Sequence, residues 1–166
     1  ALIMANLIQN GTFQNAQLHP WTFRNSNPSF KFILDPDSTT GGFCIELRPE
    51  GQPIWLEQII PMTGPGTFEF EAKRVVESGE PAEFLLGVSH TNSNGGGGLD
   101  FEQRTVASEW ERFSISVTES EYPIISGYVM VDVYDMSKED GERAMKKIGV
   151  ITPVLFRNFS FEQDDS

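Results

Sequence analysis

The chain has 166 residues, and its 24 acidic and 12 basic side chains give a formal net charge of −12. This length predicts a single domain, and 13 Phe, 3 Trp and 3 Tyr supply enough apolar bulk for a core without disulfides. An acidic surface repels phosphate backbones and anionic lipids, which argues against nucleic acid and membranes as partners. No apolar stretch approaches the roughly 18–20 residues that span a bilayer.

The N-terminal residues 1–5 lack the basic region and long apolar stretch of a secretion signal. We therefore interpret them as an N-terminal extension or expression remnant, in which Met4 is a candidate natural start. The single cysteine, Cys44, lies between Phe43 and Ile45 and predicts a small buried apolar residue.

Alternating apolar and polar side chains predict strands that are buried on one face. The predicted strands, in chain order, are 6–9, 21–23, 29–34, 42–48, 54–61, 68–73, 82–88, 112–118, 127–134 and 154–161. Gly, Pro, Asn and Ser clusters separate them. The pattern predicts an all-β, two-sheet β-sandwich of jelly-roll type with about eight to ten antiparallel strands.

The domain boundaries follow from the same pattern. We expect a single sandwich domain over 6–161 and a flexible acidic tail over 162–166. The Gly-rich segment 92–98 reads as a mobile loop, and 137–147 as a long loop with one or two helical turns.

The order of these features resembles the carbohydrate-binding modules of the galactose-binding-like superfamily, in particular those that accompany xylanases and glucanases. The segments that carry the resemblance are Asn6–Gln14 with Trp21, Gly41–Leu47, Leu56–Lys73, Ser108–Phe113 and Leu155–Phe161. The resemblance implies a jelly-roll fold and sugar binding. It also implies a structural calcium near the first and last strands, with carboxylates at the positions of Gln14 and Asn158. Both are amides here, and a hard divalent cation favours anionic oxygens, so we expect no metal and no cofactor.

The sequence shows no catalytic constellation. His19 and His90 are the only histidines, and the glycines at 95–98 lack the Lys-Ser or Lys-Thr of a phosphate-binding loop. Glu109 and Glu111 flank a tryptophan on one strand and so do not face each other across a cleft. We therefore expect the protein not to be an enzyme; a glycoside hydrolase or polysaccharide lyase ranks third among the hypotheses.

Candidate sugar-binding residues lie in three segments. Because alternation turns Val129, Val131 and Val133 inward, it places aromatic and acidic side chains on the opposite face of the same strand. The candidates are Tyr128, Asp132 and Tyr134 on that strand, Trp55 after the loop 49–53, and His90, Asn92 and Gln103 in and after the Gly-rich loop. A structural role stays open for each: the strand row as cross-strand packing and Trp55 as a core residue.

The function predicted is a non-catalytic carbohydrate-binding or adhesion module for a glycan or cell-surface polysaccharide. The alternative is a structural or decoration domain of a phage virion, tail fibre or collagen-like surface protein without sugar affinity. Unpaired strand edges would also suit a homo-oligomer or a larger assembly. Either function predicts an extracellular, cell-surface or virion location, although no signal peptide is visible in this chain.

Overall fold

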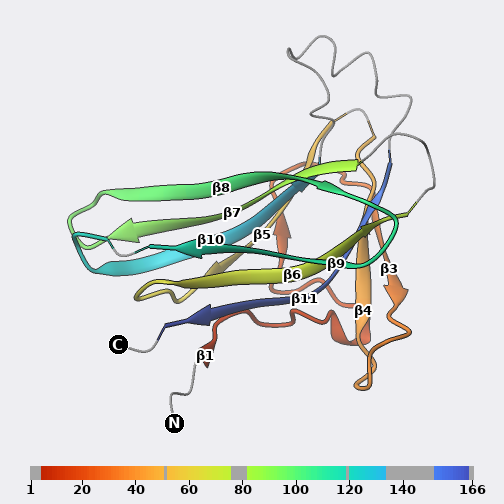
Figure 1. The fold of residues 1–166 in the computed structure, drawn as a ribbon, viewed down its shortest axis with the longest axis horizontal. Helices are drawn as coiled ribbons and strands as arrows, with labels where there is room; N and C mark the ends of the chain where they lie inside the picture. The colour runs from red at the N-terminus through yellow and green to blue at the C-terminus, as the bar shows by residue number, and fades with distance from the viewer. Residues whose placement is uncertain (1–4, 51, 76–81, 119, 134–151, 165–166) are drawn as a thin grey trace.

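A computed structural model describes residues 5–50, 52–75, 82–118, 120–133 and 152–164, which form an all-β sandwich of two antiparallel sheets (Figure 1). The elements are β1 (Ala5–Asn6), the 3₁₀ turn η1 (Gln14–Ala16), β2 (Thr22–Phe23), β3 (Phe30–Leu34), β4 (Phe43–Leu47), β5 (Ile54–Ile60), β6 (Gly66–Arg74), β7 (Ala82–Asn92), β8 (Gly97–Val106), β9 (Glu111–Val117), β10 (Ile124–Val133) and β11 (Val154–Gln163). The predicted jelly-roll sandwich is confirmed. Nothing in the described ranges is a helix that could cross a membrane.

The chain alternates between the two sheets as it proceeds. The first sheet has the order β3-β4-β11-β6-β9, with β1 paired to β11, and the second sheet has the order β2-β5-β10-β7-β8. Among the strands of the described ranges, only β3–β4 and β7–β8 are sequence neighbours that also pair. The remaining ladders join distant segments, as in Greek-key and jelly-roll sandwiches.

The core forms where the inward faces of both sheets meet. Val129, Val131 and Val133 are buried in it, as their alternation predicts. The ring of Phe70 on β6 lies 5.7 Å, centroid to centroid, from that of Phe84 on β7, which joins the two sheets. The other large, fully buried side chains are Phe13, Phe68, Phe156, Phe161, Ile45, Leu47, Ile54, Leu56, Ile60 and Met62. Trp21, 2% exposed, packs against this cluster.

A bulge in β11 sets which of its side chains face the core. The register against β6 shifts between Arg157 and Ser160, and Asn158 there has a left-handed φ of 56°. Because the extra residue breaks the alternation, Phe156 and Phe159 are both buried in the core although they are three positions apart. The amide N of Phe159 donates to the carbonyl of Gly11 at 3.1 Å, and a Cβ on Gly11 would lie 2.1 Å from the Phe159 carbonyl oxygen. Only glycine fits this contact.

The strand predictions were wrong at several places. Of the predicted strand 6–9, only Asn6 lies in a strand, β1. β8 was not predicted, because its residues are mostly exposed and it starts with two glycines inside the segment expected to be a mobile loop. The structure confines that turn to residues 93–96. β11 runs on to Gln163, so Glu162 and Gln163 pair with β6 rather than belonging to the acidic tail. The predicted loop over 137–147 lies outside the described residues.

A charged cluster covers the outer face of the first sheet around Arg157. Its guanidinium Nη1 donates to Asp35 at 2.8 Å and to Asp37 at 2.7 Å, and Nη2 donates to Glu71 at 2.9 Å. The same group lies 3.9 Å from the ring centroid of Trp110. Burial lowers the pKa of Arg157, but the hydrogen bonds to the carboxylates outweigh it and the net pKa is raised, so the side chain stays charged. We call this set the Arg157 cluster.

Removing Arg157 should leave three carboxylates without their shared cation. Because its side chain is only 8% exposed, we expect Arg157→Ala to lower the free energy of unfolding by about 3–5 kcal/mol, measured by urea titration. Arg112, which pairs with Glu69 but is 71% exposed, is the matched control, and Arg112→Ala should change stability little. Equal losses in the two variants would contradict a special role for the cluster.

Candidate ligand-binding face

The outer face of the second sheet brings predicted site residues from three strands, β5, β8 and β10, together. The strand registers place its side chains in three rows of directly opposed positions. The rows are Trp55–Asp132–Leu85–Gln103, Glu57–Met130–Gly87–Phe101 and Ile59–Tyr128–Ser89–Leu99. We call these twelve residues the second-sheet face. In β5, β7 and β10 the alternate residues, such as Leu56, Leu86 and Val131, are turned into the core.

A glycine in the middle of this face allows close packing. A Cβ on Gly87 would lie 3.0 Å from the Met130 sulfur and 3.2 Å from the Phe101 Cβ. Met130 therefore covers Gly87 and is 1% exposed, although it points away from the core. A larger residue at position 87 would require Met130 or β8 to shift.

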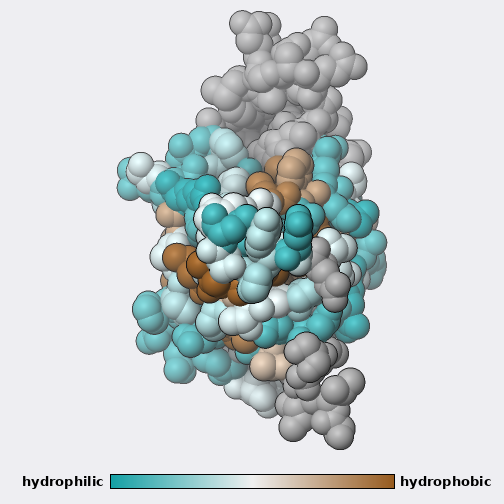
Figure 2. All heavy atoms as spheres, turned by 90° about the vertical axis from the view of Figure 1, so that its left-hand side faces the viewer, coloured by the Kyte–Doolittle hydropathy of each residue, from teal (hydrophilic) through white to brown (hydrophobic). Residues whose placement is uncertain are grey.

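One end of the second-sheet face is apolar and open. Ile59 is 77% exposed, Phe101 58% and Leu99 44%. Figure 2, which looks at the end of the sandwich with the β7–β8 hairpin, shows hydrophobic side chains reaching the surface between hydrophilic ones. Apolar side chains in water contribute nothing to stability, so this exposed set is a candidate contact surface.

Arg24, which follows β2, lies over the aromatic rings of this face. Its guanidinium carbon is 4.2 Å from the ring centroid of Trp55 and 5.0 Å from that of Tyr128. The carboxylate of Glu57 accepts a hydrogen bond from Arg24 Nε, which raises the pKa of the arginine. One face of Trp55 is therefore occupied by the chain's own cation.

Two polar atoms in the first row are buried without a partner. Trp55 and Asp132 are directly opposed, and in the part of the chain that the structure describes neither Trp55 Nε1 nor Asp132 Oδ1 has a hydrogen-bond partner. Desolvation raises the pKa of Asp132 to about 6. A buried unpaired acceptor costs stability, and such residues cluster at functional sites. Asp132 is thus a candidate ligand-binding group on this face.

The structure separates the other predicted site residues into two groups. Gln103 lies in the same row as Asp132 and is exposed. His90 and Asn92 lie within β7, not in a loop as predicted, and they share the parity of core residue Val88, so they point away from the second-sheet face. Tyr134 lies outside the described residues.

Sequence reasoning missed residues that the structure adds to this face. Leu99 and Phe101 belong to the unpredicted strand β8, and their spacing of two is the only signal that marks them. Arg24 and Glu57 are distant in sequence, and their ion pair depends on the pairing of β2 with β5. No pattern in the sequence predicts this ion pair.

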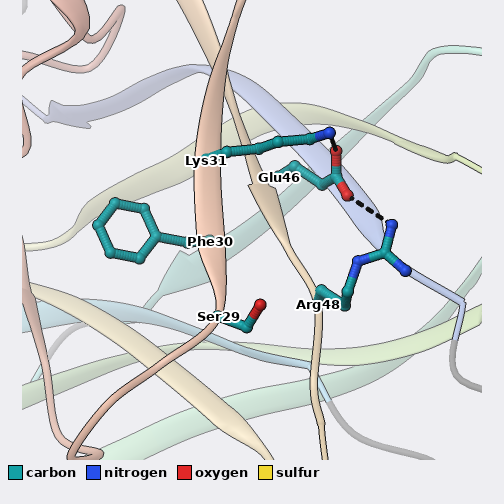
Figure 3. Close-up of a pocket in the computed structure, with 5 residues that line it drawn as sticks. All are labelled: Ser29, Phe30, Lys31, Glu46 and Arg48. Carbon is teal, nitrogen blue, oxygen red and sulfur yellow. Dashed lines mark hydrogen bonds and ion pairs between the residues drawn. The ribbon is translucent and has the colours of Figure 1, made fainter.

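A small pocket at the edge of the first sheet is a weaker candidate ligand site than the second-sheet face. Ser29, Phe30, Lys31, Glu46 and Arg48 line a space of about 80 Å³ at the β3–β4 edge, where Phe30 points away from the other four (Figure 3). Glu46 already pairs with Lys31 at 3.5 Å and with Arg48 at 3.1 Å. The carboxylate of Glu46 is therefore already paired with two cations. The space is also too small for a sugar ring.

The residues at the expected calcium position do not fit a calcium ion. Gln14 Nε2 donates to the hydroxyls of Thr12 and Thr40, and Asn158 Nδ2 donates to Glu71. These amides present donors to their neighbours, whereas a calcium site needs converging oxygens with negative charge. Among the described residues, no group of three or more His, Cys, Asp or Glu side chains could hold a metal.

Comparisons with known proteins identify the fold. No family model and no curated protein matches the chain. Among solved structures, TmCBM61 in complex with β-1,4-galactotriose superposes with a TM-score of 0.68 at 14% identity, covering 96% of this chain and 99% of that one. The CBM22-1 xylan-binding domain of Paenibacillus barcinonensis Xyn10C gives 0.66 at 14% identity, covering 100% and 99%.

A third structure comes from a virus. The enzymatically active domain of bacteriophage CBA120 tailspike protein 4 gives a TM-score of 0.67 at 12% identity, covering 95% of this chain. This chain spans only 21% of the tailspike structure. The protein thus has the fold of the carbohydrate-binding modules, as its sequence resemblance implied.

The raised pKa of Asp132 predicts a pH-dependent cost in stability. Since an ordinary Asp has a pKa of about 3.9, the folded chain holds an extra proton between about pH 4 and 6, and stability falls as pH rises through this window. We expect Asp132→Asn to exceed the wild type in free energy of unfolding by about 1–2 kcal/mol at neutral pH and to match it near about pH 4. Urea titrations at both pH values measure the difference. Asp164→Asn, at an exposed position, is the control, and a gap of the same size at both pH values would refute the assignment.

Proposed function

We propose that this protein is a non-catalytic carbohydrate-binding module that binds a neutral glycan on the second-sheet face, outside the cell or on a virion. The observation that carries the proposal is the pairing, on one sheet face, of exposed apolar side chains with the unpartnered Asp132. The fold shared with modules that bind galactotriose and xylan supports it.

The chemistry of the face suits a sugar. A pyranose ring has an apolar C–H face that packs on aromatic and aliphatic side chains such as Phe101 and Tyr128. Its rim of hydroxyls can donate to a carboxylate such as that of Asp132, which lies on this face. Gln103, in the same row, has an amide that both donates and accepts.

The charge of the face favours a neutral ligand. Asp132 and Glu57 both lie on it, and the nearby cation Arg24 is already paired with Glu57. A uronate-containing polysaccharide would bring its carboxylates against these acids and against a net charge of −12. A neutral sugar meets no such repulsion.

The acidic residues of the face also suit binding better than hydrolysis. Glycoside hydrolysis uses two carboxyl groups, one of which has to donate a proton while the other stays ionised. Glu57 is tied to Arg24 by an ion pair, so it is not free to exchange a proton with a substrate. Asp132 is then left without a second carboxylate in its row.

Truncating the apolar contacts should weaken binding without unfolding the chain. We expect Phe101→Ala, which removes a 58% exposed ring, to reduce affinity by about 1–2 kcal/mol in isothermal titration with an oligosaccharide chosen from an array of neutral and uronate-containing glycans. Phe30→Ala, which removes an exposed ring from the edge of the first sheet, is the matched control and should bind like the wild type. A wild-type chain that retains no neutral glycan on the array would contradict the proposal.

The second candidate function is a structural domain of a virion, and the similarity to the tailspike structure favours it. A decoration or fibre domain works as part of an assembly, so this function predicts a stable homo-oligomer, whereas a binding module is expected to be monomeric. Multi-angle light scattering at micromolar concentration distinguishes the two. A stable oligomer whose Phe101→Ala variant is monomeric would assign the apolar end of the face to subunit contact instead of sugar.

A further inference from the structure

The sequence contains the dipeptide Asn-Gly twice, and the two copies have opposite surroundings. Asn94–Gly95 forms the exposed tip of the β7–β8 hairpin, and Asn10–Gly11 is built into the packing of the first and last segments. We propose that Asn94 is a site of spontaneous deamidation, because the turn places the Gly96 N–H on its side-chain oxygen and leaves Gly95 open, whereas Asn10 is protected.

The reaction is an intramolecular acyl transfer. The deprotonated backbone nitrogen of Gly95 attacks Cγ of Asn94, the C–Nδ2 bond breaks, and ammonia leaves with the proton that the backbone nitrogen gave up to solvent. A five-membered succinimide results. Water then adds to either of its carbonyls, and ring opening gives aspartate or, when the backbone carbonyl is attacked, isoaspartate. Water is the only co-reactant, and no redox change occurs.

The hairpin tip supplies two features that favour this reaction. Asn94 Oδ1 accepts a hydrogen bond from Gly96 N at 2.9 Å, so the oxygen that gains negative charge during attack already faces a donor. A Cβ on Gly95 would meet no atom within 4 Å, and its φ of 86° is one that residues with a side chain rarely adopt. The attacking residue therefore has no side chain, and the space beside its Cα is open.

The turn has to loosen only slightly for the attack. Gly95 N donates to the carbonyl of Asn92 at 3.0 Å, and this bond has to open before the nitrogen can lose its proton. It lies at an exposed tip, where such openings cost little free energy. The tip lies on the left in Figure 1 and so faces the viewer in Figure 2.

Asn10 shares the first feature, because its Oδ1 accepts a hydrogen bond from Gln14 N at 2.9 Å, but it is held in a way that opposes both the loss of ammonia and the attack by the next residue. Its Nδ2, the leaving group, donates to the carbonyls of Gln17 at 2.8 Å and His19 at 3.0 Å. Gly11 is packed against Phe159, whose amide bonds to the Gly11 carbonyl. The attack at this dipeptide therefore requires the contact between the N-terminal segment and β11 to open.

The proposal is tested by ageing the folded protein in warm, mildly alkaline buffer and mapping the products by peptide mass spectrometry. Deamidation adds about 1 Da to a peptide, and an isoaspartyl methyltransferase assay detects the rearranged product. We expect the peptide with Asn94 to convert at least about tenfold faster than the peptide with Asn10. In concentrated urea, where both dipeptides are unfolded, the two rates should become equal.

The variant Asn94→Gln is the control, because a glutamine would have to close a less favourable six-membered ring. It should remove the fast product and leave the slow conversion of Asn10 unchanged. Equal rates at Asn94 and Asn10 in the folded protein, or a faster rate at Asn10, would overturn the proposal. Because the assay needs no sugar, its result is independent of the proposed glycan binding.

Discussion

The bulge at Asn158 is the constraint on which the aromatic core and the outer face of the first sheet depend. With regular alternation, β11 could not turn Phe156, Phe159 and Phe161 inward together. One left-handed residue solves this problem, and it also leaves Arg157 on the outer face of the first sheet. Since β11 is the strand that pairs with β1, β4 and β6, its side-chain orientation decides both the aromatic core and the charged cluster outside it.

The acidic residues on the two outer faces differ in whether their charges are compensated. On the first sheet, Asp35 and Glu71 are compensated by a buried arginine with several charge-assisted hydrogen bonds. On the second sheet, Asp132 is desolvated and has an oxygen without a partner within the described ranges. The first arrangement contributes to stability, and the second costs stability.

The sequence allowed the sandwich and part of the second-sheet face to be predicted, because both depend on local alternation. Val129 to Val133 fixed the side on which Tyr128 and Asp132 lie. Strand β8 could not be predicted, because this edge strand exposes both of its faces and its sequence lacks the alternation of buried and exposed residues. The placement of His90 on the core side could not be predicted without knowing that the strand continues past Val88.

The pairings that define the candidate site lie beyond any local pattern. Trp55 and Asp132 are separated by 77 positions and meet only through the register of β5 against β10. Arg24 reaches the same rings because β2 pairs with β5, so a third distant segment controls access to Trp55. A sugar that stacks on the covered face of Trp55 would have to displace Arg24 from the ring. Ligand contact there therefore competes with an interaction that the chain already makes, whereas Phe101, on the opposite edge of the sheet, is open to a ligand without any rearrangement.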